Sequence, residues 1–245
     1  MKRFFAIIVS IISLSMISHA QDSVYLVSNP QNARWSYIET DSNGKQKSTV
    51  YHSVESIHGD GVNGTMKLRV EEVPVDSPKD TVKSFIFYRF KDGELMADPG
   101  SLMLDDLFGS SIKESYPELS YEQTMEVLEV IKSEFVKITG EIRGIPRYPK
   151  EGKLPDYEYQ FKFKIMNMKL TGQERSIIGK ETIQTEAGSF DCFILEETIS
   201  TKLMLVKDVE KIRAWYAYGI GLVKEATYDK RGNLISTMIL NQVNH

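Results

Sequence analysis

The chain has 245 residues and a formal net charge of −4, and 41% of its residues are hydrophobic. This mild acidity argues against a nucleic-acid partner, because proteins that bind nucleic acids usually carry basic patches. The single cysteine, Cys192, excludes an intramolecular disulfide. We expect its thiol to be a buried strand residue rather than a reactive group, because free cysteine is often buried.

The first twenty residues have the pattern of a secretory signal peptide. Lys2 and Arg3 form a basic start, an apolar run follows, and Ser18-His19-Ala20 places small residues where a signal peptidase recognises them. The apolar run is shorter than the roughly 20 residues of a transmembrane helix. We therefore expect cleavage after Ala20 and a mature protein in the periplasm or secreted beyond it.

Alternating apolar and polar residues predict strands from residue 33 onward. The segments 33–40 and 48–57 flank Asn43-Gly44, which is the strongest short hairpin signal. The segments 66–71 and 82–90 continue the alternation. The N-terminal part of the mature chain is therefore expected to be an antiparallel meander.

The alternation of apolar and polar residues weakens between residues 97 and 135. Ser120 followed by Gln123 has the form of a capping box, and apolar residues then recur at helical spacings. Several valines in the same segment favour a strand instead. We expect one or two short helices around 101–135. The region 98–120 is the only candidate for a minor boundary within a single domain of residues 21–245.

The apolar residues change phase within residues 157–170. They occupy odd positions from Tyr157 to Ile165 and even positions from Met166 to Leu170. Since a one-residue slip exchanges the two faces of a strand, we expect a bulge or bend near Ile165 in one long strand. Long bent strands of this kind curl sheets into barrels.

Further strands joined by tight turns are expected at 175–185, 190–201 and 211–218. Gly219-Ile-Gly221 then marks a sharp corner, and Asp229-Lys-Arg-Gly232 has the chemistry of a hairpin turn. The fold class is therefore all-β and mainly antiparallel, with a bent meander that forms a β-barrel or half-barrel.

Three C-terminal segments stand out by their order and spacing: Tyr148–Asp156, Thr185–Cys192, and Trp215–Lys224 with the hairpin turn that follows it. Together they resemble a family of exported bacterial proteins that is catalogued as a domain of unknown function and labelled TapB-like. The resemblance is carried mainly by residues 145–242. It implies a barrel-like or half-barrel fold in the cell envelope, and it implies no catalytic residues.

Residues that usually carry catalysis or bind metals are scarce. His52 and His58 would lie about 20 Å apart at ~3.3 Å per strand residue, and we expect both to be exposed histidines of a sheet. Glu196 and Glu197 should point to opposite faces of a strand and cannot form an acid–base pair. We therefore expect no metal, no cofactor and no enzymatic activity, with a hydrolase that uses an unrecognised carboxylate site as a remaining alternative.

Aromatic and methionine side chains are the remaining candidates for a site. Core packing is one interpretation, because aromatic residues dominate all-β cores. An apolar cavity inside a barrel is the other. The candidate ligand-binding residues are Tyr159, Phe161, Met166, Met168, Trp215 and Tyr218. The expected function is an exported non-enzymatic binding or chaperone-like protein for a lipid-like or peptide ligand. The alternative is a structural module that binds another envelope protein through a sheet edge.

Overall fold

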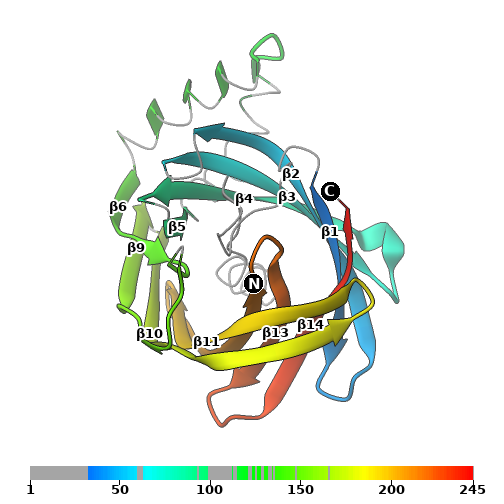
Figure 1. Cartoon of the computed structure of the whole chain (residues 1–245). Helices are drawn as coiled ribbons and strands as arrows, with labels where there is room; N and C mark the ends of the chain where they lie inside the picture. Colours follow the sequence, from blue (N-terminus) through cyan, green and yellow to red (C-terminus); the bar gives the residue numbers. More distant parts are fainter. Residues whose placement is uncertain are drawn as a thin grey trace.

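The computed structural model describes residues 33–59, 63–92, 94–98, 112, 115–120, 136–146, 148–164 and 166–244, with individual positions between 123 and 134. The described residues form one 14-stranded sheet that curls into a nearly closed barrel, which confirms the predicted fold class (Figure 1). The expected signal peptide and the segment 101–111 lie outside the described residues.

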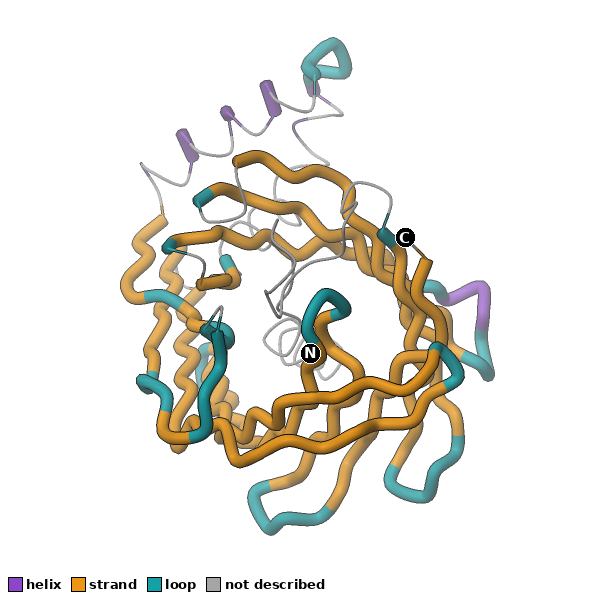
Figure 2. The backbone as a smooth tube through the Cα atoms, in the orientation of Figure 1, coloured by secondary structure: helices purple, strands orange, loops and turns teal. Residues whose placement is uncertain are grey.

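Each strand is antiparallel to its neighbours, and most connections are short turns (Figure 2). The strands are β1 (Arg34–Asp41), β2 (Gln46–Gly59), β3 (Gly64–Pro74), β4 (Val82–Lys91), β5 (Glu94–Ala97), β6 (Val136–Gly140), β7 (Ile142–Arg143), β8 (Gly152–Lys153), β9 (Tyr157–Phe163), β10 (Met166–Thr185), β11 (Gly188–Leu203), β12 (Val206–Ala217), β13 (Gly221–Asp229) and β14 (Leu234–Asn244). A short 3-10 helix, η2 (Pro78–Asp80), lies between β3 and β4.

One short stretch of chain joins the two ends of the sheet. Neighbouring strands follow the order β6-β9-β10-β11-β12-β13-β14-β1-β2-β3-β4-β5-β7, and β8 pairs with β10. Glu141 separates β6 from β7 and donates its backbone N–H to the carbonyl of Glu158 at 3.2 Å. Gly144 donates to the carbonyl of Leu95 at 3.0 Å. The chain around Glu141 therefore contacts β9 on one side and β5 on the other.

The hairpin turns that carry strong sequence signals form as predicted. The Asp41 carboxylate accepts the backbone N–H groups of Asn43 and Lys45 at 2.9 and 3.0 Å. Gly44 takes a positive φ of 77° that glycine adopts without steric cost. The turn that begins at Asp229 has the same arrangement of carboxylate and glycine.

The expected bulge near Ile165 is wrong, because the chain reverses direction there. β9 ends at Phe163 and β10 begins at Met166, and these two residues are paired across a tight turn. Lys164 takes a positive φ of 49°, a conformation that usually marks Gly, Asn or Asp. A two-residue turn moves the apolar residues from odd to even positions in the sequence, and a bulge has the same effect. Neither Gly nor Asn lies between Phe163 and Met166, so the usual signal of a tight turn is absent from the sequence.

The predicted capping box forms at the start of the helical segment. Ser120 accepts the backbone N–H of Gln123 at 3.2 Å, and the Gln123 side chain accepts the backbone N–H of Ser120 at 2.9 Å. The described positions from 123 to 134 are helical. They therefore confirm helix over strand in this part of the segment 101–135.

Side chains of different strands meet on the inner face of the barrel. The Tyr37 hydroxyl on β1 donates to the carbonyl of Leu222 on β13 at 3.2 Å. Burial raises the pKa of Tyr88 on β4, and the nearby side chains of Tyr216 and Tyr37 and the Glu225 carboxylate raise it further. Tyr88 and Tyr216 belong to strands that are far apart in the sheet order, so their proximity spans the interior.

Candidate functional site

A buried ion pair lies on the inner face of β10 and β11. Arg175 Nε donates to Glu197 Oε2 at 2.8 Å, and the two side chains are 1% and 2% exposed. Burial raises the pKa of the Glu197 carboxyl, whereas the Arg175 charge and its hydrogen bond lower it. A buried pair of this kind is costly to separate, because either partner alone would leave an uncompensated charge.

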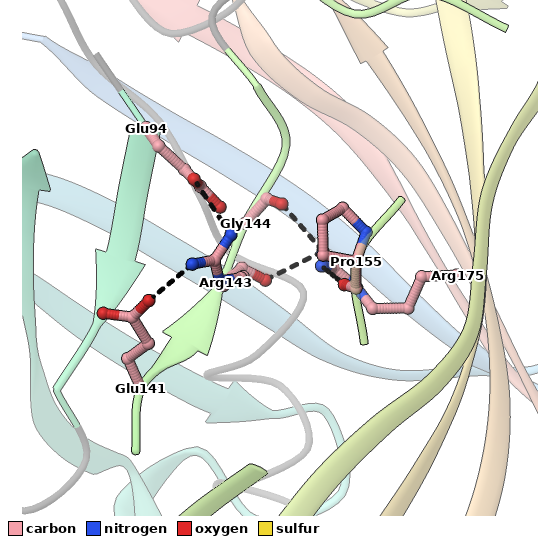
Figure 3. Close-up of polar contacts among 6 residues, drawn as sticks. All are labelled: Glu94, Glu141, Arg143, Gly144, Pro155 and Arg175. Carbon is pink, nitrogen blue, oxygen red and sulfur yellow. Dashed lines mark hydrogen bonds and ion pairs between the residues drawn. The ribbon is translucent and has the colours of Figure 1, made fainter. Parts of the chain in front are cut away.

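The same guanidinium holds the segment that joins the ends of the sheet. Arg175 donates to the carbonyls of Pro155 at 2.8 Å, Arg143 at 2.8 Å and Gly144 at 2.7 Å (Figure 3). Arg143 in turn forms an ion pair with Glu141 at 2.8 Å. Arginine suits this role because its planar guanidinium presents several donors in fixed directions. Arg175 is therefore a positioning residue for the barrel wall.

Two buried tyrosine hydroxyls on the inner face find no hydrogen-bond partner within the described part of the chain. They belong to Tyr88 on β4, 3% exposed, and Tyr157 on β9, 6% exposed. Burial raises the pKa of both phenols, and the nearby Tyr216 contributes in each case. Both are therefore neutral O–H donors, and both lie near the same third tyrosine.

His52 corrects a prediction, because it is buried and not exposed. Its side chain is 2% exposed on the inner face of β2, and its ring centroid lies 4.9 Å from that of Tyr37. Burial lowers the pKa of His52 to about 3, so the imidazole is neutral at physiological pH. His58 lies near the end of the same strand and is exposed, as expected. Regular alternation would place both histidines on the same face of β2. A register shift between Val54 and Ser56 interrupts this alternation.

Three of the six candidate ligand-binding residues lie together on the inner face. Tyr159 and Phe161 on β9 and Met168 on β10 are 2%, 0% and 0% exposed. Met168 is the cross-strand partner of Phe161. Met166, the fourth candidate, pairs with Phe163 at the start of β10.

The other two candidates lie elsewhere. Trp215 is on the outer face of β12, where its indole N–H donates to Glu181 Oε2 at 2.7 Å and the Lys224 ammonium lies 4.6 Å from its ring centroid. Tyr218 follows the end of β12, is 43% exposed and contacts the Phe193 ring edge-on at 5.0 Å. The sequence shows that this segment is rich in aromatic residues. Which of them face the interior depends on how the strands pair.

Cys192 is buried as predicted, with 1% of its surface exposed. Burial and the neighbouring carboxylates of Asp191 and Glu181 raise the pKa of its thiol to about 12. The thiolate, which is the nucleophilic form, is therefore disfavoured. Among the described residues, no group of three or more His, Cys, Asp or Glu side chains could hold a metal ion.

A recess of about 530 Å³ lies on the surface between β12 and the turn that joins β13 to β14. Burial, and then the charge of Asp208, raise the pKa of Glu210 in this recess to about 7. Its cross-strand neighbour Asp229 is held in the hairpin turn by Arg231 and Asn233. Asp208 and Asp229 line the same recess, and the Asp229 carboxylate is engaged by the backbone of the hairpin turn.

No helix in the described part of the chain combines the length and the apolar character needed to span a membrane. The fold resembles that of a candidate lipoprotein from Parabacteroides distasonis, with a TM-score of 0.61 and 20% identity over 92% of this chain and 100% of that chain. It also resembles a candidate exported protein with a YmcC-like fold from Bacteroides fragilis, with a TM-score of 0.58 and 14% identity over 90% of this chain and 99% of that chain.

No curated protein matches the chain in sequence. A family model described as DUF3108-like matches residues 31–240. The match extends well beyond residues 145–242, which carried the resemblance in the sequence, and includes the N-terminal hairpins. The chain belongs to the DUF3108-like family.

Proposed function

We propose that this protein is an exported, non-enzymatic binding or chaperone-like protein that holds an apolar ligand, lipid-like or peptide, on the inner face of its barrel. The size of the sheet supports this proposal. Barrels of about eight strands have interiors that side chains can fill, and wider barrels enclose ligands or channels. The sheet here has 14 strands, of which 13 follow one another around the ring. The resemblance to candidate exported and lipoprotein structures supports a place in the cell envelope.

The inner wall that such a ligand would contact is apolar. Tyr159, Phe161 and Met168 lie side by side on the inner faces of β9 and β10. Ligand pockets are lined mainly by hydrophobic and aromatic side chains, with a few polar groups that orient the ligand. Methionine suits such a wall because its flexible thioether adapts to different shapes.

The observation that carries the proposal is the pair of buried hydroxyls on Tyr88 and Tyr157. A buried donor without a partner costs about 1–3 kcal/mol. An acceptor group on a bound molecule, such as a carboxylate or an ester carbonyl, would remove that cost. We therefore expect an amphipathic ligand whose polar end lies near these tyrosines and whose apolar part contacts the Phe161 side of the wall.

Native mass spectrometry of the mature protein, purified without detergent from its own host, tests the proposal. We expect a reproducible added mass that extracts into organic solvent. The double variant Tyr88→Phe/Tyr157→Phe should lose most of the added mass. Tyr51→Phe is the matched control, since Tyr51 is 47% exposed on β2 and has the same chemistry.

A bare chain mass from both the native protein and the control would contradict the carrier proposal. A stoichiometric protein companion in the same spectra would favour the structural module that binds through a sheet edge. The near closure of the ring weighs against that alternative, because the terminal strands of the sheet order, β6 and β7, are short and consecutive in the chain.

A further inference from the structure

The hairpin between β11 and β12 ends in an exposed apolar tip. Leu203 pairs with Val206, so Met204 and Leu205 form a two-residue turn. Met204, Leu205 and Val206 are 52%, 96% and 48% exposed. Single exposed apolar residues are common on soluble proteins, but a run of three consecutive exposed apolar residues is unusual unless it serves a function.

The backbone of this tip does not favour the residues that occupy it. Met204 takes a positive φ of 54° at the first central position of the turn. Two-residue hairpin turns usually place Gly, Asn or Asp at such a position, because a larger side chain is strained there. The tip therefore carries large apolar side chains where stability alone would favour glycine or asparagine.

A row of lysines crosses the strands beside the tip. Lys137 on β6 pairs with Lys162 on β9. Lys202 on β11 pairs with Lys169 on β10 and with Lys207 on β12. Like charges directly opposite each other destabilise a sheet. We call these five residues the lysine row.

Little negative charge balances the lysine row. Lys169 forms an ion pair with Glu158 at 2.8 Å. The other four lysines form no ion pair with any residue that the structure describes. Asp208 is next to Lys207 in sequence, but neighbouring strand residues point to opposite faces. The row is thus a local basic surface on a chain whose formal net charge is −4.

We propose that the apolar tip and the lysine row together dock the protein onto an anionic phospholipid surface. Apolar side chains can enter the boundary between headgroups and acyl chains, while lysines contact the phosphates above it. Because the whole chain is acidic, its overall charge would not attract such a surface, and the attraction must come from this end of the barrel. The proposal does not depend on a ligand inside the barrel.

Vesicle flotation of the mature protein tests this docking. Vesicles that contain phosphatidylglycerol in phosphatidylcholine should carry the protein upward, and pure phosphatidylcholine vesicles should not. The binding should weaken as salt is added, because salt screens exposed charges. Lys202→Gln/Lys207→Gln should weaken binding roughly thirtyfold, at ~1 kcal/mol per lysine near an anionic surface. Leu205→Ser should weaken it about tenfold through lost apolar burial.

The matched control is Lys91→Gln/Lys180→Gln, which removes the same charge from exposed positions near turns at the opposite end of the barrel. It should bind as the native protein does. Leu205 is nearly fully exposed, so its substitution should leave the circular dichroism spectrum and the thermal midpoint unchanged. Equal binding to both vesicle types, no binding to anionic vesicles, or equal loss in the control variant would each overturn the proposal.

Discussion

Arg175 and Glu197 form a buried ion pair, 2.8 Å long, between neighbouring strands of the barrel wall. The remaining donors of Arg175 bind carbonyls of residues 143, 144 and 155, which belong to the chain that joins the ends of the sheet and to the loop before β9. The Arg175 side chain therefore has two roles: it neutralises the buried Glu197 carboxylate, and it holds in place the chain that closes the ring.

Breaking this pair should destabilise the fold strongly. Glu197→Leu would leave the Arg175 charge buried and uncompensated, which costs about 3–5 kcal/mol. Arg175→Met should cost at least as much, because three carbonyls also lose their donor. The free energy of unfolding from urea titrations measures both effects.

An outer ion pair provides the control for that comparison. Arg213 and Glu196 are 2.6 Å apart, with 40% and 18% of their side chains exposed. Arg213→Met should cost less than about 1 kcal/mol, because exposed pairs contribute little. A similar loss for Arg213→Met and Arg175→Met would contradict the special role of the buried pair.

The two buried phenols should behave in the opposite way to ordinary hydrogen-bonded tyrosines. Tyr88→Phe or Tyr157→Phe in ligand-free protein should leave stability unchanged or raise it by about 1 kcal/mol, because an unsatisfied buried hydroxyl is removed. Tyr37→Phe should lower stability by about 1 kcal/mol, since the Tyr37 hydroxyl donates to Leu222 at 3.2 Å. Thermal unfolding of delipidated protein distinguishes the two outcomes. A clear loss in Tyr88→Phe and Tyr157→Phe would show that these hydroxyls already have partners.

Turn chemistry and alternation were enough to predict the sheet from the sequence, because Asn43-Gly44 and the Asp229 turn carry their own structural signals. The turn at Lys164 has no such signal, so the sequence pattern predicts one long strand where the structure has the paired strands β9 and β10. Closure of the ring was also beyond prediction. It depends on pairing between β5 and β7, which are separated by a long stretch of chain.

The polar part of the candidate site could have been found in part. Glu197 occupies the same phase as Leu195 and Ile199, which are buried, so a charged residue on that face needs a buried partner. The partner, Arg175, lies where β10 changes register against β11, and no spacing rule places it. His52 also shares the phase of Val50 and Val54, which indicated burial, and the expectation of an exposed histidine overlooked that pattern.

Gly172 and Tyr157 should be strongly coupled. A Cβ at Gly172 would lie 2.3 Å from Cε1 of Tyr157, its cross-strand partner, so the ring could not remain in place. Gly172→Ala should therefore cost roughly 1–3 kcal/mol, as overpacking of a core does. In a double-mutant cycle, Tyr157→Leu should recover much of this loss, because the shorter side chain makes room. Additive effects in urea titrations would contradict the contact.

His52 should make the protein sensitive to mild acid. Its pKa is about 3 in the folded state, against 6.5 as the ordinary value. Above pH 6.5 both states hold a neutral imidazole. As the pH falls from 6.5 towards 3, the unfolded state takes up a proton and the folded state does not, so stability is lost across this range. The loss should approach about 4 kcal/mol at the acid end.

His52→Phe should flatten this part of the profile of unfolding free energy against pH, because phenylalanine has a ring but takes up no proton. The effect should leave stability at pH 8 within about 1.5 kcal/mol of the native protein, as for other core substitutions of similar volume. His58→Phe, at the exposed end of the same strand, should leave the slope unchanged. An unaltered slope in His52→Phe would mean that His52 gains access to water in the folded barrel, since only hydration or a proton acceptor would restore an ordinary pKa to this imidazole.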